Sequence, residues 1–305
     1  MGKTGGFDVV TGAFGYTGRF IAKRLLEMGR EVRTITGHPD RPDPSGGRVR
    51  AYPFNFDDPP ALIKALRGAD TLYNTYWVRF GYGGASYRQA VRNTGALFDA
   101  AREAGVRRIV HISIANAKTS RLPYYEGKAG LEDRLASLGI PYAVIRPTVL
   151  FGHGDVLIGN IAWMLRRFPV FAVAGSGGYR IQPVFVEDAA ELAVDAGQRD
   201  ENIITDAAGP EVYTFDELVL AVRDAVGSRA RLLHMPPALV LALSNILGKA
   251  LGDIVLTGDE LAGLAAGLLE SHEPPKGGTR FSDWLADNAE NLGRRYANEL
   301  KRHFK

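Results

Sequence analysis

Residues 9–18 read Val-Val-Thr-Gly-Ala-Phe-Gly-Tyr-Thr-Gly and overlap the end of the apolar run Phe7–Thr11. Each glycine suits one requirement of a phosphate-binding turn: Gly12 permits the tight turn, Gly15 lets the backbone approach a pyrophosphate, and Gly18 lets the next helix pack on the sheet. The N–H groups and the dipole of a helix start favour a phosphate. Glycines alone also serve turns that only need a positive φ, but this strand–turn–helix context predicts a dinucleotide-binding unit.

Strand-length apolar runs alternate with helical patterns through the first half of the chain. A glycine follows each of four helical patterns, at positions 29, 68, 105 and 139, where a helix C-terminal glycine belongs. This alternation is typical of an α/β protein with a Rossmann-type, doubly wound parallel sheet. The predicted strands are Phe7–Thr11, Val32–Thr36, Val49–Phe54, Thr71–Trp77, Arg108–Ser113 and Tyr142–Pro147, and the predicted helices are Gly18–Met28, Pro60–Leu66, Tyr87–Ala104 and Lys128–Leu138.

After Pro147 the pattern changes and becomes mostly helical from Thr214 onward. Two capping-box signatures, at residues 214–217 and 257–260, predict helix starts. Ile158–Arg167 and Val186–Gly197 predict helices, and Ile203–Ala207 predicts a strand that returns to the main sheet. We therefore expect a dinucleotide-binding core at residues 1–152, which residues 184–208 rejoin, and a smaller, mostly helical C-terminal lobe at residues 153–183 and 209–305 that holds the substrate.

The composition excludes several classes of site and partner. The 305 residues include 46% hydrophobic and 23% charged side chains, as in an ordinary globular protein. The chain has no cysteine, which excludes disulfides, thiolate metal sites and cysteine nucleophiles. Lys and Arg number 37 against 34 Asp and Glu, and this net charge of +3 disfavours nucleic acid as a partner.

The sequence predicts neither a membrane span nor a metal site. The first eight residues are glycine-rich and lack the apolar run of a signal peptide, so we expect a cytoplasmic protein. The longest apolar stretch, Ala238–Leu247, is interrupted by polar residues and is shorter than the ~20 residues that cross a bilayer. It predicts a helix that packs in a core or lies on a partner. His153 and Asp155 lack further metal ligands at a useful spacing and predict a loop.

The residues after the second predicted strand bear on the choice of dinucleotide. An acidic residue there would hold the ribose 2′-OH of NAD, and a basic one would accommodate the 2′-phosphate of NADP. The chain continues with Gly37, His38, Pro39, Asp40 and Arg41, so no carboxylate stands at the strand end itself. NADP(H) is favoured over NAD(H), with a solvated loop charge as the alternative interpretation of Arg41.

Tyr124 and Lys128 are four residues apart and share a helix face. A tyrosine hydroxyl titrates near pH ~10, and a nearby ammonium lowers that pKa by favouring the phenolate. Tyr124 could then exchange a proton with a substrate hydroxyl or carbonyl while a nicotinamide moves a hydride. Ser113, which ends the preceding strand, could polarise the carbonyl. Tyr125 is three residues from Lys128 and does not fit this four-residue spacing, so it is expected to pack in the core. His111 lies inside an apolar strand and is likewise expected to be a core residue.

These motifs together resemble the extended/atypical short-chain dehydrogenase/reductase family, which includes NAD-dependent epimerase/dehydratase-like enzymes. The likeness is strongest to the branch that contains an accessory subunit of respiratory complex I. It covers most of the chain and rests on residues 11–18, 93–95, 110–117, 124–128, 146–152 and 182–189. Two departures stand out: Ile114 replaces a second Ser/Thr, and Tyr76–Trp77 stand where many relatives have small residues.

The resemblance implies roles for individual residues. Tyr124 would be the acid/base, Lys128 its activator and ribose anchor, and Ser113 the carbonyl polariser. Trp77, Arg180 and Gln182 would face the substrate. The implied cofactor contacts are Gly12, Phe14, Gly15, Tyr16, Thr17, Gly18, Gly37, His38, Arg41, Asn55, Phe56, Thr75, Tyr76, Lys128, Arg146 and Pro147.

Two functions remain open at this point. The first is an NAD(P)-dependent oxidoreductase or sugar-epimerase/dehydratase-like enzyme that acts on a small-molecule substrate. The second is a non-catalytic NADP(H)-binding module that regulates or stabilises a protein partner. A homodimer is also implied by the resemblance. The basic C-terminal run that begins at Arg294 predicts a solvated helix end, with an anionic membrane surface or an acidic partner as the alternative.

Overall fold

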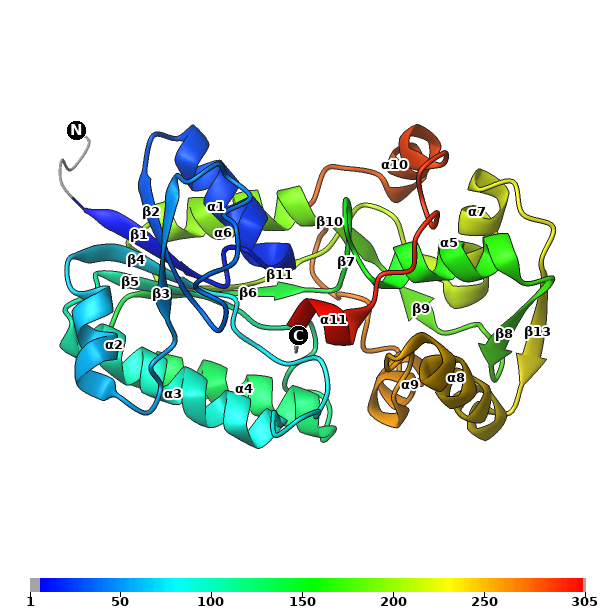
Figure 1. Cartoon of the computed structure of the whole chain (residues 1–305), viewed down its shortest axis with the longest axis horizontal. Coiled ribbons are helices and arrows are strands. Elements are labelled where there is room, and N and C mark those ends of the chain that lie inside the picture. The colour runs from blue at the N-terminus through cyan, green and yellow to red at the C-terminus, as the bar shows by residue number, and fades with distance from the viewer. Residues whose placement is uncertain (1–5, 304–305) are drawn as a thin grey trace. The chain divides into compact units, whose positions relative to one another are not determined.

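The computed structural model of the chain describes residues 6–303, and its elements are labelled in Figure 1. The glycine-rich residues 1–5 and the last two residues of the basic C-terminal run lie outside the described part. The chain divides into two compact units: unit 1 contains residues 1–147 and 186–207, and unit 2 contains residues 148–185 and 208–305. The sequence placed the first boundary at 152/153, whereas the structure places it at 147/148.

Unit 1 contains a seven-stranded sheet in the order β11-β6-β5-β4-β1-β2-β3, with every neighbouring pair parallel. This confirms the Rossmann-type prediction, including the return of β11 to the edge of the sheet. Because the strands are parallel, their carboxyl ends share one edge, where ligands bind in such folds. The strands are β1 (Phe7–Thr11), β2 (Glu31–Thr36), β3 (Val49–Pro53), β4 (Ala69–Asn74), β5 (Arg108–Ile112), β6 (Tyr142–Pro147) and β11 (Ile203–Ala207).

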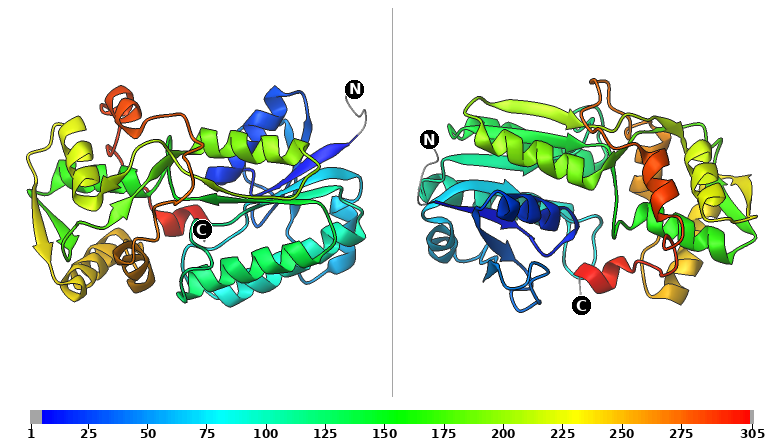
Figure 2. Two further views of the ribbon diagram at one scale, coloured as in Figure 1. Left: turned by 180° about the vertical axis from the view of Figure 1, so that it is seen from behind. Right: turned by 90° about the horizontal axis from the view of Figure 1, so that it is seen from above.

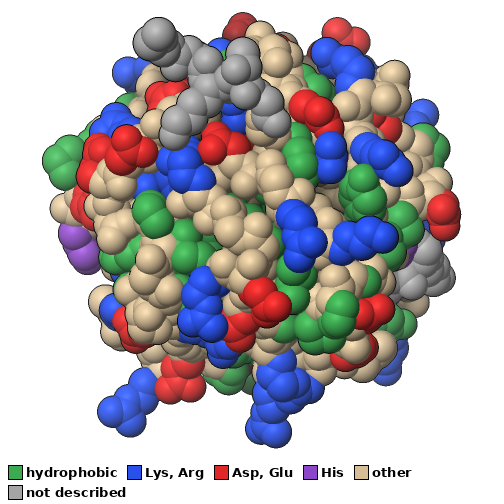
Figure 3. Space-filling model, turned by 90° about the vertical axis from the view of Figure 1, so that its left-hand side faces the viewer, with side chains coloured by type: hydrophobic (Ala, Val, Ile, Leu, Met, Phe, Trp, Pro, Cys, Tyr) green, Lys and Arg blue, Asp and Glu red, His purple; other side chains and the backbone are tan. Residues whose placement is uncertain are grey.

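Helices cover both faces of this sheet, as Figures 1 and 2 show. α1 (Tyr16–Glu27) and α6 (Val186–Gln198) pack together on one face. α2 (Pro59–Leu66), α3 (Tyr87–Glu103) and α4 (Pro123–Ser137) cover the other. Every residue of β1 and β5 is buried, as expected for strands covered on both sides. Figure 3 shows one side of the molecular surface, on which basic and acidic side chains are interspersed.

The predicted helix ends are confirmed by the glycines that follow them. Gly29, Gly68, Gly105 and Gly139 have φ values of 76°, 88°, 76° and 74°, in the left-handed region that glycine tolerates. Two predicted element boundaries were wrong by three residues or more. β4 ends at Asn74 rather than at residue 77, because the next two backbone N–H groups donate to the Thr11 hydroxyl instead of to a strand. α4 starts at Pro123, which suits the first helical turn.

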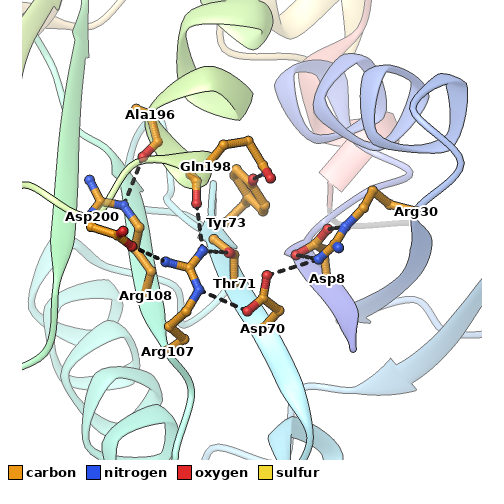
Figure 4. Close-up of polar contacts among 11 residues, drawn as sticks. Asp8, Arg30, Asp70, Thr71, Tyr73, Arg107, Arg108, Ala196, Gln198 and Asp200 are labelled. Carbon is orange, nitrogen blue, oxygen red and sulfur yellow. Dashed lines mark hydrogen bonds and ion pairs between the residues drawn. The ribbon is translucent and has the colours of Figure 1, made fainter. Parts of the chain in front are cut away.

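Charged side chains pair at the amino edge of the sheet (Figure 4). The Arg30 guanidinium donates to both oxygens of Asp8, at 2.8 and 3.2 Å, and to Asp70 at 3.0 Å. Arg107 donates to the other Asp70 oxygen at 2.8 Å and to the Gly197 carbonyl at 2.9 Å. Burial raises the pKa of the Asp8 carboxyl, and its bonds to Arg30 oppose that rise. The cluster joins the starts of β1 and β4 to the end of α6.

Unit 2 has its own hydrophobic core, built around Phe151, Ile158, Leu218 and Phe281. It contains three two-stranded sheets: β7 with β10, β9 with β12, and β8 with β13. The predicted capping boxes are present at the starts of α7 and α9. Most of its regular structure is helical, as expected. Its strands were not predicted, because strands of two to five residues are too short to show periodicity.

The elements of unit 2 are β7 (Val149–Phe151), α5 (Leu157–Arg167), β8 (Val170–Ala174), β9 (Arg180–Ile181), β10 (Pro183–Phe185), β12 (Tyr213–Thr214), α7 (Phe215–Ala225), β13 (Arg231–Met235), α8 (Pro237–Leu251), α9 (Gly258–Ala265), α10 (Phe281–Asn288) and α11 (Glu299–His303). Within residues 6–303, no helix has the length and apolar character that crossing a bilayer requires.

Candidate functional site

The glycine turn lies between β1 and α1 at the carboxyl edge of the unit 1 sheet. Gly12 has φ 62°, and a Cβ on Gly18 would overlap with the carbonyl group of Gly12. A Cβ on Gly15 would approach the Gly12 oxygen to 3.1 Å. No side chain caps α1 at Gly15, and its first turn holds no acidic residue. The turn therefore keeps the compact backbone and the uncapped helix start that a pyrophosphate group fits.

A buried polar network that the sequence did not reveal fixes this turn to the neighbouring strands. The Thr11 hydroxyl donates to Asn74 Oδ1 at 3.0 Å, and it accepts the backbone N–H groups of Thr75 and Tyr76 at 2.8 and 3.0 Å. The Asn74 amide lies 2.9 Å from His111 Nδ1. Burial, followed by the charge of Lys128, lowers the pKa of His111 well below its usual value. His111 is thus a neutral core residue, as predicted.

Aromatic side chains gather beside the ends of β2, β3 and β4. Phe54 and Phe56 stack with 4.7 Å between ring centroids, and Tyr76 packs against both at 4.9 and 5.0 Å. Asn55 between them has φ 47°, and a Cβ on Gly37 would meet the Phe54 ring at 3.3 Å. Of the expected cofactor residues, the structure therefore brings together Gly37, Asn55, Phe56 and Tyr76.

The loop after β2 carries the two basic residues, His38 and Arg41, on which the predicted choice of dinucleotide depends. The His38 N–H donates to the Thr36 hydroxyl at 3.2 Å, and the Arg41 N–H donates to the His38 carbonyl at 3.2 Å. β2 ends at Thr36, so the strand end itself carries no carboxylate.

Tyr124 and Lys128 both lie in α4, one turn apart. The Lys128 ammonium donates to the Ile112 carbonyl at 2.8 Å and lies 4.5 Å from the centroid of the Trp77 ring. Burial lowers the pKa of Lys128 to about 7, and the charge of Glu132 opposes this. The Trp77 ring also contacts the Tyr124 ring edge-on, with centroids 5.6 Å apart. A Cβ on Gly127 would lie 2.9 Å from Trp77, so the indole rests directly on α4.

Ser113 is engaged by a carboxylate that the sequence analysis missed. Its hydroxyl donates to Glu132 Oε1 at 2.5 Å, and Arg146 donates to both Glu132 oxygens at 2.9 and 2.5 Å. Glu132 is almost fully buried, with 1% of its side chain exposed. The available signal was position: Glu132 follows Lys128 by four residues and therefore shares its buried helix face. The hydroxyl proton of Ser113 is directed at this carboxylate.

Arg180 and Gln182, which were expected to face a substrate, lie in unit 2 and form hydrogen bonds with other groups of the protein. Arg180 donates to Glu270 at 2.8 Å on the surface. Gln182 is buried: its amide donates to the Gly209 carbonyl at 2.8 Å, and its oxygen accepts the Ser271 N–H at 3.0 Å. In this structure Gln182 ties two distant segments of the chain to β9 and β10.

The His153–Asp155 segment is a loop, as expected. Asp155 accepts the backbone N–H groups of Ile158 and Gly159 at 2.7 and 3.2 Å, and therefore stabilises the start of α5. Burial raises the pKa of its carboxyl to about 6. Within residues 6–303, no group of three or more His, Asp or Glu side chains could hold a metal ion.

Comparisons with known proteins agree with this geometry. Residues 12–156 match the family model described as NAD(P)H-binding. A mitochondrial protein of Neurospora crassa, named NADH-ubiquinone oxidoreductase 40 kDa subunit, is 24% identical over 271 residues, which cover 83% of this chain and 68% of that protein. These matches agree with the resemblance to the extended/atypical short-chain dehydrogenase/reductase family that the sequence motifs indicated. Its similarity to complex I subunits covers 61% to 68% of their lengths.

Two further members of the comparison are named as enzymes. The ceramide reductase of Caulobacter vibrioides is 24% identical over 246 residues, covering 79% of this chain and 77% of that protein. The solved structure of the NADPH-dependent quinone oxidoreductase QOR2 from Escherichia coli, in complex with NADPH, superposes with a TM-score of 0.74. It is 21% identical and covers 94% of this chain and 99% of that one. The chain therefore has an NAD(P)-binding fold like that of this solved structure.

Proposed function

We propose that this protein is an NADP(H)-dependent oxidoreductase that interconverts a carbonyl group and an alcohol on a small molecule. The observation that carries the proposal is the Tyr124–Lys128 pair on α4, with the Lys128 ammonium anchored on the Ile112 carbonyl next to Ser113. The uncapped start of α1 and the compact glycine turn supply the fit for a dinucleotide pyrophosphate.

Each residue has a defined task in this proposal. A bound nicotinamide supplies or accepts the hydride. Tyr124 holds the proton that passes to or from the substrate oxygen, and the Lys128 ammonium favours its phenolate. Because the pKa of Lys128 is about 7, both its charged and its neutral forms are populated near neutral pH. Glu132 and Arg146 orient Ser113 and are positioning residues.

NADP(H) is favoured over NAD(H) because His38 and Arg41 follow β2 and no carboxylate stands at the strand end. Titration of the protein with NADPH and NADH, followed by tryptophan fluorescence, tests this choice. We expect tighter binding of NADPH, and loss of the preference when His38 and Arg41 are both replaced by Ala. Equal affinity for both dinucleotides in the unmodified protein would contradict it.

Turnover is tested by NADPH oxidation with a small quinone and with a ketone-bearing lipid as probes, chosen from the names of the enzyme relatives. Tyr124→Phe is expected to lower the rate by about 100-fold or more and to leave NADPH binding intact. Tyr125→Phe is the matched control, because this neighbouring ring packs in the core and its pKa is raised by burial to about 12. An undiminished rate in Tyr124→Phe would contradict the assignment of Tyr124 as the acid/base.

A second candidate function is a non-catalytic NADP(H)-binding module that acts on a protein partner. Two contacts favour it: the Ser113 proton is directed at Glu132, and the Trp77 ring lies over Lys128. This candidate predicts tight NADPH binding with no turnover of either probe, and no gain of turnover in Trp77→Ala. If the protein is the proposed enzyme, we expect it in the cytoplasm. A partner of the complex I type would instead place it beside a membrane complex.

A further inference from the structure

Helix α8 of unit 2 carries apolar side chains on its outer side as well as on the side that packs. Its inner residues Val240 and Leu241 join a small core cluster with Ala174 and Leu261. A Cβ on its buried Gly248 would lie 2.6 Å from the Asp253 carbonyl, so the chain approaches this side closely. A surface helix of a globular protein normally carries polar side chains on its outer side. The outer side of α8 therefore requires an explanation.

The outer side of α8 carries a continuous exposed apolar stripe. Leu239, Leu243 and Ile246 follow one another at helical spacing, with exposed fractions of 46%, 42% and 66%. The exposed residues Ala242 and Ala250 extend the stripe. Ile246 is the most exposed large hydrophobic residue of the described chain. Contiguous apolar surface of this kind marks an interaction site.

The β8–β13 ribbon continues the apolar surface. Side chains alternate along strands, so Val170 shares a face with Ala172, and Leu233 shares a face with Met235. Ala172 and Met235 pack against the α8 cluster, so this is the face on which α8 lies. Beyond the helix, Val170 and Leu233 are 43% and 46% exposed. An apolar pocket of about 580 Å³ opens beside α8 and α9, with Leu241, Leu261 and Ala262 in its wall.

The charged side chains of α8 itself and of the segment that leads into it are all basic, whereas the neighbouring helix α9 carries Asp259 and Glu260 in its first turn. Between Asp224 and Asp253 the chain contains Arg229, Arg231 and Lys249 but no acidic residue. Arg231 lies on the same ribbon face as Leu233, and Lys249 lies near the end of α8. Within the described residues none of these three cations forms an ion pair. The surface therefore combines apolar side chains with unneutralised positive charge.

We propose that the outer side of α8 docks on the surface of a lipid bilayer that contains anionic lipids. Leu239, Leu243 and Ile246 enter the boundary between headgroups and acyl chains, while Lys249 and Arg231 stay at the level of the lipid phosphates. A second copy of the chain fits less well, because a two-fold interface would place this positive surface against itself. The inference does not depend on the cofactor or on the reaction proposed above.

Co-sedimentation of the full chain with vesicles tests the proposal. We expect binding to vesicles of phosphatidylcholine mixed with phosphatidylglycerol, and weaker binding to phosphatidylcholine alone. The double variant Leu243→Ser/Ile246→Ser should lower the affinity by about tenfold or more, since it removes two of the three inserted side chains. Lys249→Glu should lower binding to the anionic vesicles and leave binding to the neutral ones unchanged.

Met28→Ser is the matched control, because Met28 is an equally exposed apolar residue (44%) at the end of α1 in unit 1. It should bind vesicles as the unmodified chain does. All variants change exposed side chains, and thermal unfolding checks that they stay folded. Absence of vesicle binding, or equal binding by the double variant, overturns the proposal. So does a concentration-dependent dimer that the double variant dissociates, since that result would assign the surface to a second copy.

Discussion

The two edges of the unit 1 sheet are built from the same strands but are occupied in different ways. At the amino edge, Asp8, Arg30, Asp70 and Arg107 neutralise one another through hydrogen bonds of 2.8 to 3.2 Å. At the carboxyl edge, α1 starts without a side-chain cap, and Lys128 is buried where its charge is disfavoured. The first arrangement serves stability. The second keeps binding groups available at a cost in stability, as functional sites generally do.

The largest effect is expected from breaking the amino-edge cluster. Asp8→Ala removes a fully buried carboxylate and leaves Arg30 with a single partner. Loss of one member of a buried ion pair should lower the free energy of unfolding by about 4 kcal/mol. Urea unfolding measures this change. NADPH affinity under native conditions should be unchanged, because Asp8 lies at the opposite end of β1 from the glycine turn. A coupled loss of affinity would show that the two edges are not independent.

The second-largest effect is expected at the carboxyl edge, where a substitution should raise the free energy of unfolding instead of lowering it. The folded chain holds the pKa of Lys128 at about 7, against 10.5 for an ordinary lysine. Between these values the unfolded chain binds the extra proton, so stability rises with pH in this window. Lys128→Met should remove this dependence and stabilise the protein at pH 7 by about 3 kcal/mol, with loss of turnover. Unfolding experiments across pH 7 to 10.5 test this, and the same pH slope in both proteins would contradict it.

Gly18→Ala should disturb both stability and binding. The new Cβ would overlap with the Gly12 carbonyl and force α1 away from the turn. We expect a loss of about 2 kcal/mol in unfolding free energy together with weaker NADPH binding. Gly130→Ala is the control, since a Cβ there meets no atom within 4 Å and alanine favours the helix. If Gly18→Ala bound NADPH normally, the glycine turn would not be the pyrophosphate site.

The smallest effect is expected for an exposed ion pair on the surface of the helices, away from both edges of the sheet. Lys23 and Glu187 form an ion pair of 3.1 Å across α1 and α6, with both side chains more than one third exposed. Lys23→Ala should change the unfolding free energy by less than about 0.5 kcal/mol, because solvent screens such pairs. Thermal unfolding compared with Asp8→Ala measures the contrast between surface and buried pairs. A similar loss in both variants would refute the distinction drawn for the amino edge.

Local patterns predicted unit 1 well because its strands are completely buried and its helices end at glycines. They did not predict that β4 stops at Asn74, since that depends on the Thr11 hydroxyl, 63 residues earlier in the chain. Glu132 was missed for the same reason: its partners Ser113 and Arg146 come from two other elements of the chain. In unit 2, strands as short as two residues gave no periodic signal.

The sequence by itself determined the parallel α/β core, the glycine turn and the Tyr124–Lys128 spacing, because each depends on backbone conformation or on neighbours within one helical turn. The tertiary structure decided the contacts of those groups: the Ser113 hydroxyl is directed at Glu132, Trp77 lies over Lys128, and the outer side of α8 stays exposed. Burial and long-range pairing set these outcomes, and both are properties of the packed chain rather than of any single segment.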